Sequence, residues 1–344
     1  MNHKIKVALI WTFLALTLAT MVWFKLSQPR VLVLHSYSPD YSWTRDIDIG
    51  IKRALETKLR YKVQWHYMDT KNHPDSEFKR KAGALARRAI DALGPDLIIA
   101  VDDDAQTYAV KEFAGSAKVA IIFAGINGTV DAYGYNKVNN ATGIYERKPL
   151  LDLRRALSAM QGPNGSALER RILQLGDQSD SVKADVREID DFDWAPFRIV
   201  ESQLVNTFDD WKKSVLEAKD NADIILISNF QNLYETPGNS RLVDATDVMK
   251  WTELNSPLPV FGIGGFMVEE GGMFAVGASG FEQGEVAARM AIEVLDRGVS
   301  PKSIAQVMPQ QFLVYIRRSL MAKHGLSLPP IYEAFARASN NFHE

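Results

Sequence analysis

The residues best equipped for chemistry in this sequence lie at 35–37, directly after the apolar run 31–34. His35 and Ser36 are of the types that serve as base and nucleophile in covalent catalysis. Neither a GxSxG elbow nor a recognisable acid partner or oxyanion loop accompanies them. We therefore expect His35, Ser36 and Tyr37 to form a hydrogen-bonding wall of a binding site rather than catalytic machinery.

Two aromatic residues, Tyr41 and Trp43, follow this cluster. Their rings suit stacking on a flat ligand, and they suit packing of the next amphipathic stretch against a sheet equally well. Both interpretations stay open, and Trp43 is counted among the candidate ligand-binding residues.

Three consecutive acids, Asp102, Asp103 and Asp104, end another apolar run. Adjacent carboxylates resemble the oxygen ligands of a hard metal ion, but they lack a recognised metal-binding spacing. Asp is also favoured at the start of a helix, and a helical stretch follows here. We expect helix capping plus a ligand-facing acid, with Asp102 and Asp103 as the candidates, and neither a metal nor a cofactor.

Small and hydrogen-bonding residues follow the remaining apolar runs. They let a ligand approach backbone N–H groups and offer hydrogen bonds of their own. The candidates are Gly125, Asn127, Asp177, Ser228 and Asn229. The glycine-rich segment 262–266 lacks the lysine and the spacing of a phosphate-binding loop, so a hinge or a close backbone approach is expected there.

The elements that must position these residues are short apolar runs alternating with amphipathic stretches. Apolar runs with little polar alternation, separated by helices, are typical of parallel strands in a sheet covered on both faces. The predicted strands are 31–35, 61–69, 96–104, 119–127, 170–177, 197–202, 223–230, 259–266 and 273–279. The predicted helices are 44–59, 75–93, 105–115, 149–160, 179–192, 208–220, 242–254 and 282–298.

The order of elements repeats after residue 149, which indicates two Rossmann-like α/β lobes of similar size. Ligands of such sheets bind beyond the carboxyl ends of the strands. We therefore expect one cleft that gathers the strand-end residues. The predicted ligand-binding set is His35, Ser36, Tyr37, Trp43, Asp102, Asp103, Gly125, Asn127, Asp177, Ser228 and Asn229.

The N-terminal segment differs from the rest of the sequence, because residues 7–24 carry no charge and follow Lys4 and Lys6. The run is long enough to span a bilayer and long for the apolar part of a cleaved signal. The bulky residues 21–24 provide no small-residue cleavage site. We expect residues 1–30 to be an uncleaved signal anchor; a cleaved signal peptide is the alternative, and a buried core helix ranks behind both.

Composition narrows the function classes. A hydrophobic content of 46% supports folded cores and argues against disorder. A net charge of −2 argues against nucleic-acid binding through neutralised phosphates. With no cysteine in the sequence, disulfides, thiolate metal sites and cysteine nucleophiles are excluded.

Five segments, taken in this order, resemble the ABC-transporter substrate-binding protein family of the type I periplasmic binding fold. In particular, they resemble its branch of stand-alone and sensor-associated extracytoplasmic domains. The segments are HSYSPDYSWTRDIDIGI, PDLIIAVDDDAQTYAV, VAIIFAGINGTVDAYGY, NATGIYE and GASGFEQGEVAARMAIEVLDRGVSP. The resemblance covers about residues 31 to 335.

The resemblance implies two lobes that are joined by three crossing segments and close around a small ligand. The crossings would fall near 144–149, 267–275 and 302–311. The first lobe would then comprise 31–146 and 276–304, and the second 147–275 and 305–344, after the anchor at 1–30.

The function that follows is binding of a small polar solute, cationic or zwitterionic and compatible with an amino acid, on the periplasmic side of a bacterial inner membrane. The expected partner is an inner-membrane permease; a sensor kinase or cyclic-dinucleotide signalling protein is the alternative. Because this sequence lacks the lipidated cysteine of a transport lipoprotein, the resemblance supports ligand binding more strongly than transport. An enzyme would need a complete catalytic constellation, and a repressor of the same fold would carry a DNA-binding headpiece where the apolar run lies.

Overall fold

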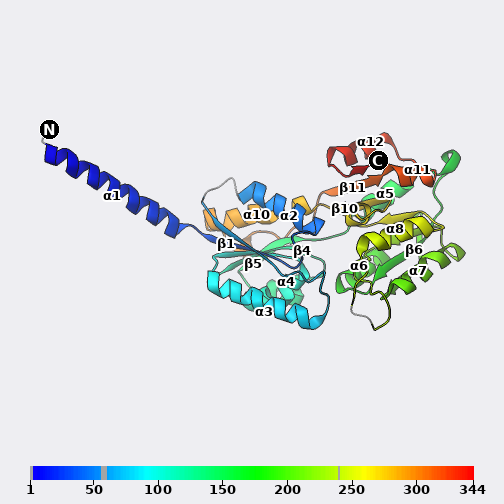
Figure 1. Ribbon diagram of the computed structural model, residues 1–344, viewed down its shortest axis with the longest axis horizontal. Coiled ribbons are helices and arrows are strands. Elements are labelled where there is room, and N and C mark those ends of the chain that lie inside the picture. The colour runs from blue at the N-terminus through cyan, green and yellow to red at the C-terminus, as the bar shows by residue number, and fades with distance from the viewer. Residues whose placement is uncertain (1–2, 56–59, 239–240) are drawn as a thin grey trace.

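The computed structural model describes residues 3–55, 60–238 and 241–344 and shows two α/β lobes side by side (Figure 1). The first lobe contains a five-stranded sheet with the order β2-β1-β3-β4-β5. The second contains a seven-stranded sheet with the order β12-β11-β10-β9-β8-β6-β7. The predicted α/β class with two lobes is confirmed.

The first sheet is parallel throughout. Its strands are β1 (Arg30–His35), β2 (Lys62–Tyr67), β3 (Leu97–Val101), β4 (Ala120–Ile126) and β5 (Ala141–Tyr145). Its helices are α2 (Ser42–Leu55), α3 (Ser76–Leu93), α4 (Asp102–Tyr108) and α10 (Gly280–Arg297), with short 3-10 helices η1 (Val110–Phe113), η2 (Val130–Tyr133), η3 (Tyr135–Lys137) and η6 (Pro301–Ser303). The predicted helix 44–59 is observed as α2 up to residue 55, and residues 56–59 lie outside the described residues.

Side chains alternate between the two faces of this sheet, and both faces are apolar. Leu32 and Leu34 of β1 pack with α3 and α4 on one face. Val31 and Val33 pack with α2 and α10 on the other. This double burial explains why the strands read as continuous apolar runs in the sequence.

Two helices of this lobe show how the sequence sets their ends. Asp75 caps α3 by accepting a hydrogen bond from the Phe78 amide at 2.8 Å, and Gly94 ends it at φ +55°. The expectation that an aspartate caps α4 is wrong, since the cap position is Val101 and makes no side-chain bond. Instead the Ser36 hydroxyl, from the neighbouring strand end, accepts the Ala105 amide at 2.8 Å.

The second sheet contains one antiparallel pair, β10 with β11, and its other neighbouring strands pair in parallel, so β11 and β12 run opposite to the remaining five strands. Its strands are β6 (Arg171–Asp177), β7 (Arg198–Val205), β8 (Ile224–Ile227), β9 (Val260–Gly262), β10 (Phe274–Ala278), β11 (Phe312–Arg317) and β12 (Phe342–His343). Its helices are α5 (Leu150–Ala159), α6 (Asp180–Asp191), α7 (Phe208–Glu217), α8 (Ala245–Asn255), α9 (Phe266–Glu269), α11 (Arg318–Lys323) and α12 (Pro330–Ala338), with 3-10 helices η4 (Pro163–Gly165) and η5 (Ala218–Asp220). Of the predicted strand 259–266, only β9 at 260–262 is observed, and α9 already begins at Phe266.

The two sheets are connected at three places along the chain, after β5, after β10 and after η6. The start of α10 ties two of these places together. The Glu282 carboxylate accepts the Gln310 and Gln311 amides at 2.9 Å from the third connection. Gln283 donates to the Tyr145 carbonyl at 2.8 Å at the end of β5. Strand β10 pairs within the second sheet, so residues 276–278 lie with the second lobe rather than the first; the other predicted lobe boundaries stay our proposal.

The N-terminal helix α1 (His3–Ser27) extends away from the first lobe without covering either sheet (Figure 1). It is long and apolar enough to cross a bilayer, a property that signal sequences share. Its apolar side chains, including Trp11, Phe13 and Trp23, are exposed. The helix therefore contributes nothing to the cores of the two lobes.

Candidate ligand-binding cleft

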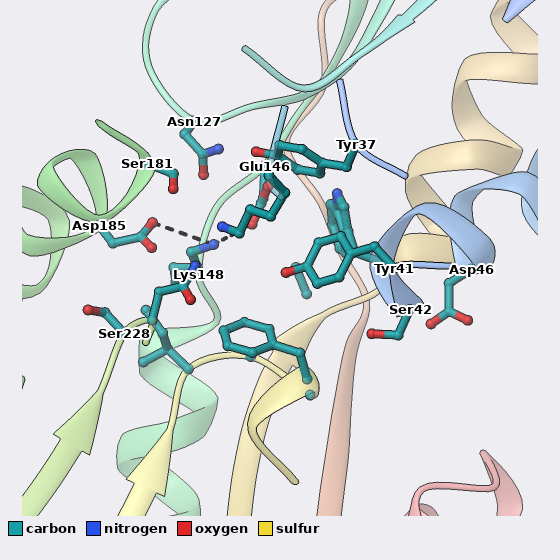
Figure 2. A pocket seen from close by; sticks show the side chains of 18 of the residues that line it. Tyr37, Tyr41, Ser42, Asp46, Asn127, Glu146, Lys148, Ser181, Asp185 and Ser228 are labelled. Carbon is teal, nitrogen blue, oxygen red and sulfur yellow. Dashed lines mark hydrogen bonds and ion pairs between the residues drawn. The ribbon is translucent and has the colours of Figure 1, made fainter. Parts of the chain in front are cut away.

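A cavity lies between the two lobes, beyond the carboxyl ends of strands from both sheets (Figure 2). Its volume is about 70 Å³. The lining combines aromatic rings, charged groups and small polar residues: Tyr37, Tyr41, Trp43, Phe266 and Tyr315; Asp46, Lys71, Glu146, Lys148, Asp185 and Glu269; Ser42, Asn127, Ser181, Ser228 and Asn229; and Ile263, Gly264, Gly265 and Ala278.

Aromatic rings form an apolar wall that crosses the gap. The rings of Tyr37 and Tyr41 meet edge to face, with centroids 5.6 Å apart. Tyr41 also faces Phe266 of the second lobe at 6.4 Å. A Cβ at Gly265 would overlap the Tyr315 ring, so this glycine permits the close approach that the 262–266 segment predicted. Rings from both lobes thus present one apolar surface to a bound molecule.

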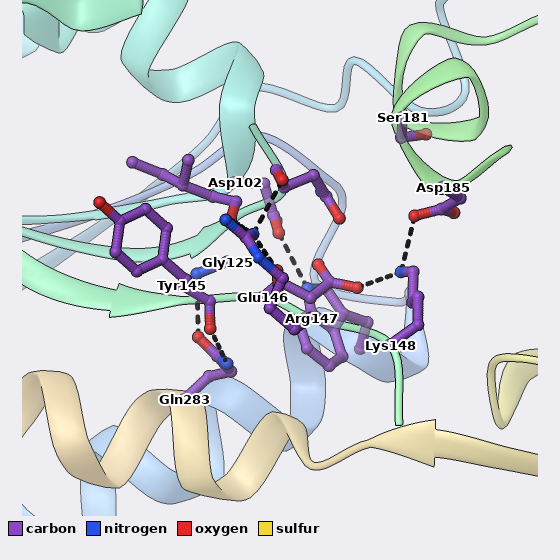
Figure 3. A network of polar contacts seen from close by, with 12 residues as sticks. Asp102, Gly125, Tyr145, Glu146, Arg147, Lys148, Ser181, Asp185 and Gln283 are labelled. Atoms are coloured by element: carbon purple, nitrogen blue, oxygen red, sulfur yellow. Dashed lines mark hydrogen bonds and ion pairs between the residues drawn. The ribbon is translucent and has the colours of Figure 1, made fainter. Parts of the chain in front are cut away.

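Glu146, Lys148 and Asp185 form a charged triad where the first connection between the lobes meets α6 (Figure 3). The Lys148 ammonium contacts the Glu146 carboxylate and lies 3.4 Å from Asp185 of α6. Lys148 and Asp185 therefore link the connecting segment to the second lobe. All three side chains are largely buried.

Burial raises the pKa of the Asp185 carboxyl to about 7, although the charge of Lys148 opposes the shift. Burial also works against a charged Lys148, but the carboxylates of Asp185 and Glu146 outweigh it and raise the pKa of this lysine. Two carboxylates therefore share one ammonium that stays protonated.

Lys71, in the loop after β2, reaches the same cavity. Its ammonium lies 5.5 Å from the Tyr37 ring centre and 5.9 Å from that of Tyr41. Burial lowers the pKa of Lys71, while the charges of Asp177 and Asp185 partly offset this. The lysine thus borders the apolar wall and the acidic side of the cavity.

A second, wider cavity of about 440 Å³ adjoins the first, and both are lined by Tyr37, Lys71, Asn127 and Ser181. Its other lining side chains are mostly hydroxyls and amides from both lobes, including Thr70, Thr107, Ser179, Gln178, Asn206 and Asn232. It forms a polar part of the same cleft.

The Asn232 side-chain amide donates a hydrogen bond across the cleft, from the second lobe to the Lys71 carbonyl of the first, at 3.0 Å. Asn232→Ala is expected to shift the protein toward an open form by about 1 kcal/mol, because the bond exists only when the lobes approach. The distance between spin labels at Lys111→Cys and Lys213→Cys, one on each lobe, measures this shift without background because the chain has no cysteine. Asn255→Ala on the surface of α8 is the control; equal distance distributions in all proteins would contradict the prediction.

Five of the predicted ligand-binding residues line the main cavity: Tyr37, Trp43, Asn127, Ser228 and Asn229. Asp103 lines the second cavity, where it accepts hydrogen bonds from Tyr133 at 2.6 Å and Asn127 at 3.0 Å. The remaining five, His35, Ser36, Asp102, Gly125 and Asp177, line neither cavity.

His35 points into the first lobe instead of the cleft. Its side chain is fully buried, with Nε2 2.8 Å from the Asp48 carboxylate and the ring stacked on Tyr67 at 5.3 Å. Burial lowers the pKa of His35 despite Asp48. The prediction that His35 contacts the ligand is therefore not supported, because its ring holds β1, β2 and α2 together inside the first lobe.

The other four residues also have internal partners. Ser36 caps α4, as described above. The Asp102 carboxylate accepts the Trp43 indole N–H at 2.9 Å, and a Cβ at Gly125, whose φ is +71°, would overlap it. The Asp177 carboxylate accepts hydrogen bonds from the backbone amides of Ser179 and Asn232 at 2.9 and 3.0 Å, which fixes two loops of the second lobe relative to each other. These four position the cleft rather than line it.

The three consecutive acids do not converge on one point. Asp102 bonds Trp43, Asp103 bonds Tyr133 and Asn127, and Asp104 pairs with Lys79 at 3.0 Å. Within the described ranges of the chain, no cluster of three His, Asp or Glu residues is arranged to hold a metal.

Sequence reasoning missed several residues of the cavity, above all Lys71, Glu146, Lys148, Asp185 and Phe266. Lys71 follows β2, a strand that alternates and is only partly buried, so its end carries no strand-end signal in the sequence. Glu146 and Lys148 lie in a connecting segment, and Asp185 lies one turn inside α6, so no strand-end rule points to them.

The chain has the type I periplasmic binding fold, since two sheets of this order are joined at three places around a cavity that both lobes line. Residues 200–334 match the family described as ABC transporter substrate binding protein. This match agrees with the resemblance found in the sequence, and the matched family and the structural neighbours are binding proteins rather than enzymes. No curated protein matches the sequence.

Three solved structures show the fold over most of the chain. The ABC domain from Streptococcus pneumonia in complex with L-Trp has a TM-score of 0.66 at 18% identity, covering 90% of this chain and 98% of that one. A conserved domain protein from Vibrio cholerae has 0.65 at 15% identity, covering 92% and 100%. The ligand-free, open structure of a substrate binding protein with adhesive properties from Clostridium difficile has 0.60 at 14% identity, covering 92% and 98%.

Proposed function

We propose that this protein closes on a small polar solute outside the cytoplasm and presents it to a permease of the bacterial inner membrane. The observation that carries the proposal is the cavity between the lobes, whose rings and charges come from both sides. Such a site is complete only when the lobes approach, so a ligand that contacts both lobes favours the closed form. A membrane partner can then distinguish closed from open protein.

The helix α1 supports an anchored form of this protein. Its length and composition suit a membrane span, and the exposed apolar side chains need a nonpolar environment. We propose that α1 tethers the lobes to the periplasmic face of the inner membrane; release as a soluble periplasmic protein after signal cleavage is the alternative. Intact mass of the protein from membrane and periplasmic fractions distinguishes the two.

A tethered receptor also fits a second function, that of a ligand-sensing accessory of a sensor kinase or a cyclic-dinucleotide signalling protein. The same helix favours it, since a membrane-bound binding protein can report to a neighbour without releasing its ligand. Cross-linking in membranes followed by mass spectrometry separates the two: a permease subunit supports transport, and a sensor protein supports signalling.

Native mass spectrometry of the full chain, purified gently in detergent, tests binding itself. We expect a co-purifying small molecule, and we expect Tyr41→Ala and Asn229→Ala to weaken its binding about tenfold or more, because each removes a lining group. Asn255→Ala on the surface of α8 is the matched control. Wild-type binding in both cleft variants would reject this cavity as the site.

A further inference from the structure

The two lysines of the cavity differ in their partners. Lys148 is neutralised by Glu146 and Asp185. Among the residues that the structure describes, no acid lies within ion-pair distance of the Lys71 ammonium, and no acceptor forms a hydrogen bond with it; its neighbours are the rings of Tyr37 and Tyr41. Lys71 thus differs from Lys148 in having no ion-pair contact among the described residues.

Other donors near Lys71 are also uncommitted. Within the described part of the chain, the hydroxyls of Tyr37 and Tyr41 and the amide nitrogen of Asn229 make no hydrogen bond to protein, and all three residues line the same cavity. The Asn229 oxygen, in contrast, is used by the Phe230 and Gln231 amides. Donors without acceptors around one ammonium are the complement of an anionic group.

The charge balance of the whole cavity restricts the ligand further. Four acids and two lysines line it: Asp46, Glu146, Asp185 and Glu269 against Lys71 and Lys148. A purely anionic ligand would add to this excess of negative charge, whereas a ligand that also has a positively charged group would not.

We propose that Lys71 determines specificity by binding the carboxylate of a small zwitterion, whose cationic group is stabilised by the acids of the cavity and whose apolar part lies against Tyr41 and Phe266. This inference rests on the proposed solute-binding function and names the chemistry of its ligand. It agrees with the lowered pKa of Lys71, since burial disfavours the charged amine more than the charges of Asp177 and Asp185 favour it, and a carboxylate bound in contact would favour it further.

The test uses the full chain in detergent, cleared of endogenous ligand by unfolding and refolding, with thermal shift and calorimetry as readouts. Three classes of probe are compared: the common α-amino acids, the amines that lack the carboxylate of those that bind, and neutral monosaccharides such as D-glucose. We expect one or more amino acids to bind and the matching amines and the sugars to fail. Lys71→Met is expected to weaken amino-acid binding about 10- to 100-fold, the loss typical of a charged hydrogen bond.

Two variants control for structure and charge. Lys71→Arg keeps the positive charge and is expected to bind within about tenfold of the wild type. Lys118→Met removes one charge from an exposed surface and should bind like the wild type. The unliganded melting temperature of Lys71→Met shows whether the variant is folded, and if it is not, the Lys71→Arg protein and the amine probes still decide the question.

The outcomes separate the two proposals. If sugars bind in place of amino acids, or if Lys71→Met binds an amino acid as tightly as the wild type, solute binding stands and the role of Lys71 is overturned. If the wild-type protein carries no small molecule when purified and responds to no probe, both proposals are overturned.

Discussion

Lys148→Met is expected to lower the free energy of unfolding by about 3–5 kcal/mol near neutral pH. The substitution removes the ammonium that Glu146 and Asp185 share and leaves two buried carboxylates without a counter-charge. The connection between β5 and α5 would lose its ionic link to α6, so lobe closure should suffer with stability. Urea unfolding followed by circular dichroism measures the loss.

The pH dependence gives this prediction a second signature. Asp185 has a folded pKa of about 7 against an ordinary value of 3.8. The folded protein therefore holds a proton that the unfolded chain releases, and the free energy of unfolding falls as pH rises between these two values. In Lys148→Met the charge that lowers the Asp185 pKa is missing, so the fall should be larger and continue above pH 7.

Lys183→Met is the matched control, because Lys183 pairs with Asp180 on the exposed surface of α6. This substitution should lower the free energy of unfolding by less than about 1 kcal/mol. Combining Lys148→Met with Asp185→Asn should recover part of the stability by removing one of the stranded charges. A single variant as stable as the control at neutral pH, or one with the pH profile of the wild type, would disprove the assigned role of the triad.

Gly284→Ala is expected to destabilise the protein by about 3 kcal/mol, the upper range for overpacking. A Cβ at this position would overlap the Ile47 carbonyl oxygen and come within 2.9 Å of the Ile51 amide nitrogen, both on the backbone of α2. Backbone atoms cannot rotate away as a side chain can, so α2 and α10 would have to separate. Because α10 also holds the connections between the lobes through Glu282 and Gln283, binding should weaken as well.

Helix propensity acts in the opposite direction, since alanine is favoured over glycine inside a helix by about 1 kcal/mol. Any net loss of stability in Gly284→Ala must therefore come from the clash between α10 and α2 where the two helices cross. Gly128→Ala provides the comparison, because a Cβ at Gly128 meets no atom within 4 Å. The melting temperatures of both variants test this prediction. A Gly284→Ala protein as stable as Gly128→Ala would contradict the packing argument.

Much of the fold was predictable because its signals are local. Runs such as 31–34 and 97–101 have apolar residues on both faces of the strand, which indicates a sheet covered by helices on both sides. Asp75 and Gly94 mark the two ends of α3 within the sequence itself. The antiparallel β11 was not predicted, since pairing direction depends on where the chain returns from the other lobe.

The candidate site was predictable only in part. Strand-end reasoning found Tyr37, Asn127 and Asn229, which line the cavity, but also His35, whose ring turns into the first lobe. Successive side chains at a strand end point to different sides, and a sequence does not say which side becomes the cleft. The choice follows from how α2 and its Asp48 pack beside His35.

The sequence by itself determined the alternation of strands and helices, the polar residues at the strand ends and the long apolar helix, because each depends on neighbours along the chain. The tertiary structure alone decided that Lys71, Lys148 and Asp185 meet in one cavity. They come from a loop of the first lobe, a connecting segment and a helix of the second lobe, and only the approach of the two lobes brings their charges together.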